Sequence, residues 1–394
     1  MRDTAFIICE YNPFHNGHAL HIKETRKAGA KNIVCVMSGN FVQRGEAAFC
    51  DKTTRAEFAI KNGADLVLEL PLKYVVSGAP RFAEGAVNVI KSLKTQGTLS
   101  FGASADLEEL KLLAAYSSDP KVLANACEYS KIHGTTFAHS IHKVMLEVYP
   151  AADMLFRDAN NILASEYIKA MHRCGCDFDL FAVKRTSIHD SLFPETHIAS
   201  AKHIRESMYR DRSPEPCKPF LPESVLSVLK TEWQRGSLPT DRTKLSVAAM
   251  SRLYLLSGND FRSVNGVNQG LENRILQCIK NTSDLYLLCD AVKTKRFTHA
   301  RIRQILISAF LGIKKEALER PNPYIRVLGM NQKGRALLRE YRETSDVPLI
   351  MNLSEAPDCE ERSLDANSGQ LYDLCRPIPF NKSPEYAMKP YVSE

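Results

Sequence analysis

One stretch near the start of the chain constrains the fold more than any other, because it joins a buried strand to a helix through a short polar loop. Residues 5–9 form a continuous apolar run, which is typical of a strand buried inside a parallel sheet. After Pro13 the apolar positions follow helical spacing. A strand that leads directly into a helix is the repeating unit of an open α/β sheet. The pattern therefore predicts that His15 and His18 lie at the carboxyl edge of such a sheet, where ligands bind.

The two histidines have the spacing of a phosphate-binding pair. His15 and His18 are three residues apart in the first helical turn, so both imidazoles can reach the same ligand. Gly17 lets a phosphate approach the backbone, and a helix N-terminus offers it free N–H groups. Imidazole donors aimed at an α-phosphate would stabilise the charge that builds when a nucleophile attacks. Two histidines could also simply cap a helix, but the order of strand, loop, glycine and helix favours nucleotide binding.

The first half of the chain alternates between strand and helix patterns, and a charged helical segment over residues 107–148 interrupts this alternation as an insertion. The pattern predicts an α/β fold, with a doubly wound parallel sheet and helices on both faces. Further strands are expected at residues 32–37, 66–70, 98–101 and 180–183, and helices at residues 52–61, 83–93 and 160–173.

A cluster of prolines between residues 212 and 222 prevents a helix from continuing through that region. We place a domain boundary there, between an α/β domain of residues 1–211 and a mainly helical domain of residues 223–394. Residues 223–343 are expected to be helical throughout. The end of the chain, with a strand-like run at residues 347–351, is expected to dock back as a turn-rich tail.

The composition excludes several classes of protein. With 44% hydrophobic and 25% charged residues in a chain of 394, two globular cores are expected and a disordered chain is not. No apolar run approaches the roughly 20 residues that span a membrane, and no signal peptide is evident, so we expect a cytoplasmic protein. The 11 cysteines fit free thiols in a reducing compartment. Cys174 and Cys176 lack a second pair at zinc spacing, so no structural metal is predicted.

Two further regions carry cations where an anionic ligand would need them. Lys184 and Arg185 end the last predicted strand, and the helix start at residues 200–205 offers Ser200 and Arg205, which can hold phosphates opposite the histidines. Residues 293–303 contain five cations and an aromatic residue, and no acidic residue occurs between positions 293 and 315. A charge run is usually a solvated helix face, but this one-signed excess slightly favours RNA binding.

Several segments together resemble the bacterial tRNA(Met) cytidine acetate ligase family. This family belongs to the nucleotidyltransferase superfamily with the His-x-Gly-His signature, which also contains class I aminoacyl-tRNA synthetases. The resemblance extends over both predicted domains, and its segment 37–45 is especially specific because general nucleotidyltransferases lack it. The matching segments are residues 10–18, 37–45, 62–65 with 69–71, 160–163, 200–205 and 323–329.

The resemblance implies a two-step ligase that uses ATP and Mg²⁺. Acetate would attack the α-phosphate of ATP, giving acetyl-adenylate and pyrophosphate, and the acetyl group would pass to the wobble cytidine of elongator tRNA(Met) to give N(4)-acetylcytidine. Residues 1–211 would then form the catalytic ATP-binding domain and residues 223–394 the tRNA-binding domain. His15 and His18 would be the catalytic residues, stabilising the transition state at the α-phosphate.

The residues expected to bind ATP, largely implied by this resemblance, are Ile7, Ile8, Cys9, Glu10, Tyr11, Asn12, Pro13, Phe14, His15, Asn16, Gly17, His18, Ala19, Leu20, Gly102, Asn161, Arg185, Thr186, Ser200 and Arg205. Without the resemblance, Gly102 is a plain turn glycine and Asn161 an ordinary helix cap. The acetate pocket is our own expectation, at Ser38, Asn40 and Gln43. The residues expected to contact the tRNA backbone are Lys295, Arg296, Arg301 and Arg303.

The chain departs from the family pattern at two places, and two other functions stay open. Residues 186–190 differ from the Gly-Ala-x-Tyr-His type of run expected there, and Lys202 replaces a small hydroxyl residue. Both departures concern the phosphate side of the site. The alternatives are an adenylyltransferase of small-molecule metabolism, which would leave the basic helical region unused, and a non-catalytic RNA-binding protein, which the intact histidine motif argues against.

Overall fold

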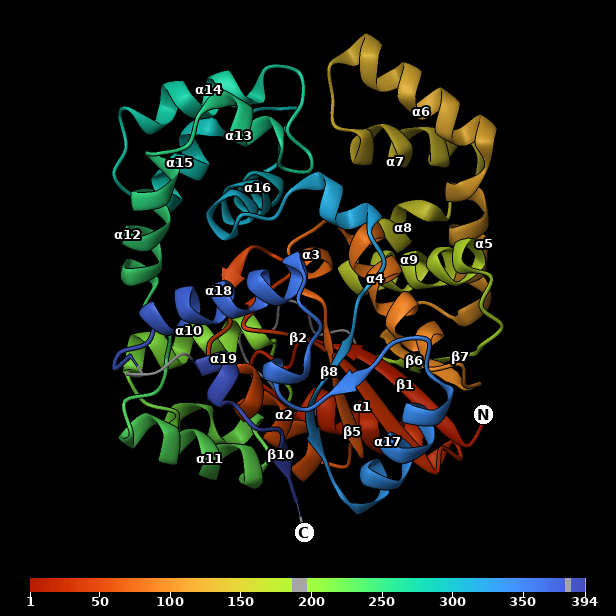
Figure 1. The fold of residues 1–394 in the computed structure, drawn as a ribbon. Helices are drawn as coiled ribbons and strands as arrows, with labels where there is room; N and C mark the ends of the chain where they lie inside the picture. Colours follow the sequence, from red (N-terminus) through yellow and green to blue (C-terminus); the bar gives the residue numbers. More distant parts are fainter. Residues whose placement is uncertain (186–196, 380–383, 394) are drawn as a thin grey trace.

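The centre of the molecule is a mixed sheet with helices on both faces, seen in a computed structural model that describes residues 1–185, 197–379 and 384–393 (Figure 1). Within these residues the strand order is β10-β8-β5-β2-β1-β6-β7, and β9 pairs with β8. The contacts among β5, β2, β1, β6 and β7 are parallel, whereas β8 runs antiparallel to β5. The strands are β1 (Thr4–Cys9), β2 (Asn32–Ser38), β5 (Leu66–Leu70), β6 (Thr98–Ala103), β7 (Asp179–Lys184), β8 (Ile325–Met330), β9 (Leu349–Ile350) and β10 (Tyr391–Val392).

Both faces of the sheet are apolar, because the buried strands are mainly apolar runs and their side chains point alternately to the two faces. Phe6 of β1 joins one hydrophobic core, whereas its neighbour Ile7 joins another. The first core is covered by α4 (Ala79–Ser92) and α9 (Ala159–Cys174), and the second by α1 (Asn16–Lys27), α2 (Lys52–Lys61), α10 (Ala201–Asp211) and α11 (Glu223–Gln234). The predicted doubly wound α/β fold is therefore confirmed.

The charged segment between β6 and β7 folds as a separate group of helices, as the sequence predicts. Its helices have a small apolar core of their own, built around Leu113, Met145 and Leu155. Figure 1 shows α6 and α7 (gold) well away from the sheet. The helices are α5 (Leu107–Ser118), α6 (Pro120–His133), α7 (Phe137–Val148) and α8 (Ala152–Phe156).

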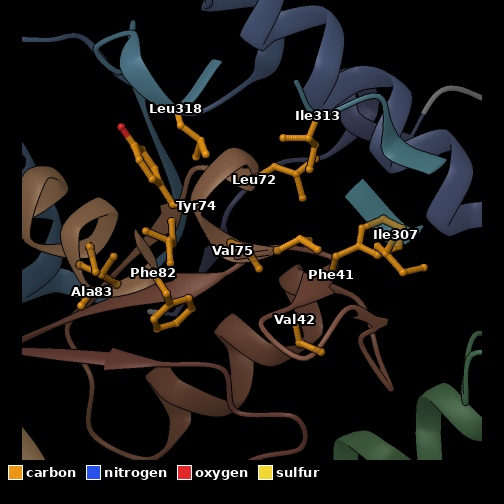
Figure 2. Packing of buried hydrophobic residues seen from close by; sticks show 14 of the residues in the cluster. Phe41, Val42, Leu72, Tyr74, Val75, Phe82, Ala83, Ile307, Ile313 and Leu318 are labelled. Atoms are coloured by element: carbon orange, nitrogen blue, oxygen red, sulfur yellow. The ribbon is translucent and has the colours of Figure 1, made fainter. Parts of the chain in front are cut away.

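A second group of helices follows α11 and forms another lobe, teal in Figure 1. Its last long helix, α16, packs against the α/β part of the molecule. Figure 2 shows Ile307 of α16 in one apolar cluster with Phe41 and Leu72, which come from β3 (Phe41–Val42) and α3 (Leu72–Val75). The helices of this lobe are α12 (Arg242–Leu253), α13 (Gly258–Arg262), α14 (Leu271–Ile279), α15 (Leu285–Val292) and α16 (His299–Leu311).

The expectation of helix throughout residues 223–343 is wrong at β8. Ile325–Met330 is buried at every position and pairs with β5, so this run takes strand form because it covers the otherwise open edge of the sheet. α17 (Gln332–Thr344) follows it, and α18 (Glu360–Leu374) and α19 (Pro384–Ala387) precede β10. The end of the chain thus joins the same sheet as its beginning, and the division at residues 212–222 stays a prediction.

The returning tail places a buried carboxylate between two buried cations. Glu385 of α19 accepts a hydrogen bond from Lys52 Nζ at 2.8 Å and pairs with Arg326 of β8. Lys52 also pairs with Glu69 at 2.8 Å. Burial alone would raise the pKa of Glu385, but the charges of Lys52 and Arg326 outweigh it and lower this pKa. We call these four residues the buried charge network.

Two features are absent from the described residues. None of the helices they form is both long enough and apolar enough to cross a membrane. Within the same ranges, no three His, Cys, Asp or Glu side chains lie together as a group that could hold a metal ion.

Candidate functional site

A cavity of about 450 Å³ lies at the carboxyl edge of the sheet, where the strand order reverses. The helices after β1 and β6 cover opposite faces of the sheet, so the ends of these neighbouring strands leave a crevice between them. The cavity wall comes from the end of β1, the starts of α1, α9 and α10, the ends of β6 and β7, and the turn after β3. This is the edge at which the sequence predicts a ligand site.

Most of the predicted site residues line this cavity, namely Ile7, Ile8, Cys9, Glu10, Tyr11, Asn12, His15, Gly17, His18, Leu20, Gln43, Gly102, Arg185 and Arg205. The others are not part of its wall, namely Pro13, Phe14, Asn16, Ala19, Ser38, Asn40, Asn161 and Ser200. Thr186 falls outside the described residues. The binding roles of all these residues stay predictions.

His15 and His18 are held so that both rings present the same donor. Their rings stack, with centroids 3.7 Å apart. Nδ1 of His15 accepts a hydrogen bond from the Gly17 N–H at 3.1 Å, and Nδ1 of His18 accepts one from the His15 N–H at 3.2 Å. A ring nitrogen that accepts a hydrogen bond carries no proton, so each neutral ring has its N–H at Nε2. The pair therefore supplies two Nε2–H donors within the cavity wall.

The surroundings keep these rings neutral. Burial lowers the pKa of His15 to about 3, and the positive charge of Arg185 acts in the same direction. Burial also lowers the pKa of His18 well below its usual value, helped by the charges of His15 and Arg185. His21, one helical turn further along α1, has its pKa lowered to about 4 by burial and by Arg185. An uncharged imidazole can donate a hydrogen bond to a phosphate without repelling Arg185.

Gly17 is needed for a reason that the sequence did not suggest. A Cβ at this position would lie 2.9 Å from Cε1 of His15, which is closer than real Cβ atoms approach. The absence of a side chain therefore lets the His15 ring fold back over its own helix start. Phe14 supports the pair from behind, since its buried ring lies 5.5 Å from that of His18.

A second part of the wall is built from β6, β7 and the start of α9. Arg185 donates a hydrogen bond from Nη1 to Oδ1 of Asn160 at 3.2 Å. A Cβ on Gly102 would lie 3.2 Å from Cδ of Arg185, so the glycine makes room for this arginine. Asn161 faces away from the cavity, and its Oδ1 accepts hydrogen bonds from the N–H groups of Ser104 at 3.0 Å and Ala105 at 3.2 Å. Asn161 thus shapes the loop after β6, and Asn160 faces the ligand space.

A third part of the wall is the turn after β3. Glu10 accepts a hydrogen bond from the Gln43 N–H at 2.7 Å. Burial raises the pKa of Glu10, against the opposing effects of this hydrogen bond and of Arg55. Arg55 is fully buried and donates to the carbonyls of Glu10 at 2.7 Å and Ser38 at 3.1 Å. It therefore joins the ends of β1 and β2 beneath the cavity.

Two residues at the start of α10 have separate tasks. Ser200 is the N-cap of α10, accepting from the His203 N–H at 3.2 Å, which is the ordinary capping role. Arg205 lines the cavity and donates to the carbonyl of Asn12 at 2.6 Å. Burial lowers the pKa of Arg205 below its usual range.

The structure separates the three expected acetate residues. Gln43 lines the cavity, whereas Asn40 points to the buried charge network, with Nδ2 3.3 Å from Oε1 of Glu385. Ser38 is fully buried, and among the described residues its Oγ has no hydrogen-bond partner. Gln43 is therefore the member of this set that a ligand in the cavity can reach.

The expected tRNA contacts also differ from one another. Lys295 and Arg296 are exposed, and Arg296 donates to the carbonyl of Gly134 in the insertion at 3.3 Å. Arg301 stacks on Phe297 and donates to a backbone carbonyl. The Arg303 side chain is only 15% exposed and pairs with Glu46 at 2.8 Å.

Several residues of the cavity wall were missed from the sequence. His21 could have been found, because it repeats the three-residue spacing of His15 and His18; its Nε2 lies 2.9 Å from Oγ of Ser100. The other wall residues were not predicted to bind the ligand, although Lys184 was noted at a strand end and several of the rest lie in the segments 37–45, 160–163 and 200–205 that resemble the family. They are Arg44, Ala79, Phe82, Phe101, Ala159, Asn160, Ile162, Leu163, Tyr167, Val183, Lys184, Ile198 and Ala201.

Comparisons with known proteins agree with this geometry. Residues 1–385 match the HIGH Nucleotidyl Transferase family. A tRNA(Met) cytidine acetate ligase of Thermoanaerobacter sp. (strain X514) is 36% identical, covering 89% of this chain and 88% of the relative. The corresponding protein of Halothermothrix orenii is 34% identical, covering 95% of both.

A solved structure shares the whole fold. The crystal structure of Thermotoga maritima TmcAL bound with alpha-thio ATP superposes with a TM-score of 0.89 at 28% sequence identity, covering 99% of each chain. The apo form of the same protein also gives a TM-score of 0.89. The family match over nearly the full length and the relatives above 30% identity lead to one conclusion: this chain belongs to the tRNA(Met) cytidine acetate ligase family of HIGH nucleotidyltransferases.

Proposed function

We propose that this protein activates acetate with ATP and transfers the acetyl group to the wobble cytidine of elongator tRNA(Met). The observation that carries the proposal is the pair of neutral imidazoles of His15 and His18, each with an Nε2–H donor in the cavity at the sheet edge. Two features add support. The relatives are named for this activity, and one of them was crystallised with an ATP analogue in the same fold.

In the first step, a carboxylate oxygen of acetate attacks the α-phosphorus of ATP, and the bond to the pyrophosphate leaving group breaks. The products are acetyl-adenylate and pyrophosphate. The Nε2–H groups of His15 and His18 would donate to the α-phosphate oxygens, whose negative charge increases in the transition state. Arg185 and Arg205, which also line the cavity, would bind the phosphates. No nucleophile from the protein is needed, because acetate itself attacks.

Mg²⁺ is proposed as the companion of ATP, and the donor set of the cavity fits this role. In nucleotide sites Mg²⁺ usually keeps several waters and binds through substrate phosphates and one or two carboxylates. Glu10 is the carboxylate in the cavity wall, and one of its oxygens accepts from Gln43. The other oxygen is the candidate ligand. Bound Mg²⁺ would neutralise charge on the pyrophosphate.

In the second step, the exocyclic amine of the cytidine attacks the acetyl carbon, AMP leaves and the amine loses a proton. The target base must be unpaired, which an anticodon loop supplies. The exposed Lys295 and Arg296 lie in the basic segment that would contact the tRNA backbone. A tRNA substrate is also the reason we propose a cytoplasmic location.

The test is ATP–pyrophosphate exchange by the purified protein, with and without acetate and before any tRNA is added. Acetate-dependent exchange is expected, followed by acetylcytidine in elongator tRNA(Met) once that tRNA is supplied. His18→Ala should abolish exchange and leave tRNA binding intact, because the imidazole acts on the phosphate. Absence of acetylcytidine with unmodified elongator tRNA(Met), ATP and acetate all present would refute the proposal.

A further inference from the structure

We propose that Arg303 and Gln304 of α16 are positioning residues for acetate activation. This inference rests on the function proposed above. These two side chains hold residues 43–46, the turn that closes one side of the cavity. The helix α16 overlaps the end of the basic segment 293–303. For this reason the sequence alone led us to assign Arg303 to the tRNA backbone.

The contacts between α16 and this turn are direct and specific. Nη1 of Arg303 pairs with Oε1 of Glu46 at 2.8 Å, and its Nε donates to the carbonyl of Arg44 at 2.6 Å. Nε2 of Gln304 donates to the carbonyl of Gln43 at 2.7 Å and to that of Ser77 at 2.9 Å. Two adjacent helix residues thus bind two consecutive backbone carbonyls and one carboxylate of the turn.

The turn touches the cavity on its other side. Gln43 and Arg44 line the cavity, and the Gln43 N–H donates to Glu10, which directly follows β1. The turn is therefore held between the end of β1 and α16. A shift of α16 would be passed to the Gln43 side chain, the one expected acetate contact that faces the cavity.

The backbone of the turn is adapted to this close contact. Gly45 has a φ of +71°, a conformation that side chains disfavour. A Cβ there would lie 3.0 Å from the backbone C and O of Arg303 and from the N of Gln304. Gly45 therefore allows the turn to lie directly against the helix.

Arg303 has little capacity left for an RNA phosphate. Its side chain is 15% exposed, and its partner Glu46 is 23% exposed. Because Nε and Nη1 are already engaged, the arginine is neutralised and oriented inward. Lys295, by contrast, is exposed at the start of the same basic segment. Buried, paired cations position structure, whereas exposed ones are available to a polyanion.

The test compares Arg303→Gln and Gln304→Ala with the wild type in acetate-dependent ATP–pyrophosphate exchange, without tRNA. We expect kcat/KM for acetate to fall by about 10- to 100-fold. The KM for acetate should rise more than the KM for ATP. Affinity for elongator tRNA(Met) should stay within about twofold. Glu46→Gln should change the kinetics in the same direction as Arg303→Gln. The Glu46→Gln/Arg303→Gln double variant should lose no more than Arg303→Gln alone, because Glu46 acts through Arg303.

The matched control is Arg262→Gln, which removes an arginine paired with Glu272 at 3.1 Å in the same helical lobe but away from the cavity. It should exchange as the wild type does. Normal exchange with weakened tRNA binding in Arg303→Gln would overturn the inference, since the arginine would then be an RNA contact. Equal loss of exchange and tRNA binding would also overturn it, as general damage. Absence of exchange in the wild type would instead refute the proposed function.

Discussion

The neutral state of the paired histidines can be tested by lowering the pH. An ordinary histidine with a pKa near 6.5 would be about three-quarters protonated at pH 6. His15, with a pKa of about 3, would be protonated to about 0.1% at the same pH. The free enzyme should therefore keep both imidazoles neutral throughout the range from pH 6 to pH 8.

The two cases differ by a measurable factor. If both rings had ordinary pKa values and both had to be neutral, kcat/KM for ATP at pH 6 would fall by about 17-fold relative to its plateau. With the pKa of His15 at about 3, protonation of this ring would lower kcat/KM at pH 6 by only about 0.1%, and the lowered pKa of His18 acts in the same direction. The quantity kcat/KM is the appropriate one, because it reports ionisations of the free enzyme rather than of the ATP complex.

The assay has two parts. Acetate-dependent exchange is measured from pH 6 to pH 8 at limiting ATP, and ¹⁵N spectra of the free protein are recorded over the same range. The ring nitrogens of His15 and His18 should stay in the neutral form protonated at Nε2, because Nδ1 accepts a backbone hydrogen bond in each. His15→Gln serves as the assignment control for the spectra. An inflection near pH 6.5 in both measurements would refute the reasoning.

The same shift has a consequence for stability, and its sign follows from proton uptake. The folded His15 has a lower pKa than the unfolded one, so the unfolded chain binds more protons below pH 6.5. Above pH 6.5 this histidine does not lower the free energy of unfolding. As the pH falls from 6.5 toward 3, protonation of the unfolded chain lowers it progressively. The loss reaches about 5 kcal/mol at the acid end, as an order of magnitude.

Three further predictions concern other parts of the molecule. Glu385→Gln removes the negative charge that the buried Lys52 and Arg326 share, so the free energy of unfolding in urea should fall by about 3–5 kcal/mol. An unchanged midpoint would contradict the role of the buried charge network. Gly102→Ala would push on Arg185 and should raise the KM for ATP in the exchange assay, while thermal unfolding stays the same. Lys295→Ala should weaken tRNA binding and reduce the slope of log affinity against log salt by about 1, with exchange unaffected; an unchanged slope would remove Lys295 from the interface.

The sequence predicted the site where local pattern decides the structure. The strand, loop and helix around His15 carry their own signals in apolar spacing and in Gly17, and the cavity forms where these signals place it. The pattern also predicted the positions of the parallel strands along the chain and the helical insertion. Asn160 and Asn161 show the limit, because which of two neighbours faces a cavity depends on a helix rotation that spacing alone does not determine.

The features that sequence missed are those made by distant contacts. β8 was expected to be helical because nothing local shows that β5 leaves an open edge for Ile325–Met330 to cover. Arg303 looked like a free cation because its partner Glu46 is more than 250 positions away in the chain. Asn40 turns from the cavity toward Glu385 for the same reason. Charge runs therefore need a structure before they can be assigned to a partner.

The position of β8 and Glu385 in the chain has a consequence for biosynthesis. A ribosome that adds 5–20 residues per second would release Glu385 roughly 15 to 60 seconds after β5. The outer edge of β5 has no partner until β8 has been made, and Lys52 lacks one of its two carboxylates until Glu385 has been made. The nascent chain is thus open to edge-to-edge association at β5 until β8 has been made. A chaperone that shields β5 would act in this window.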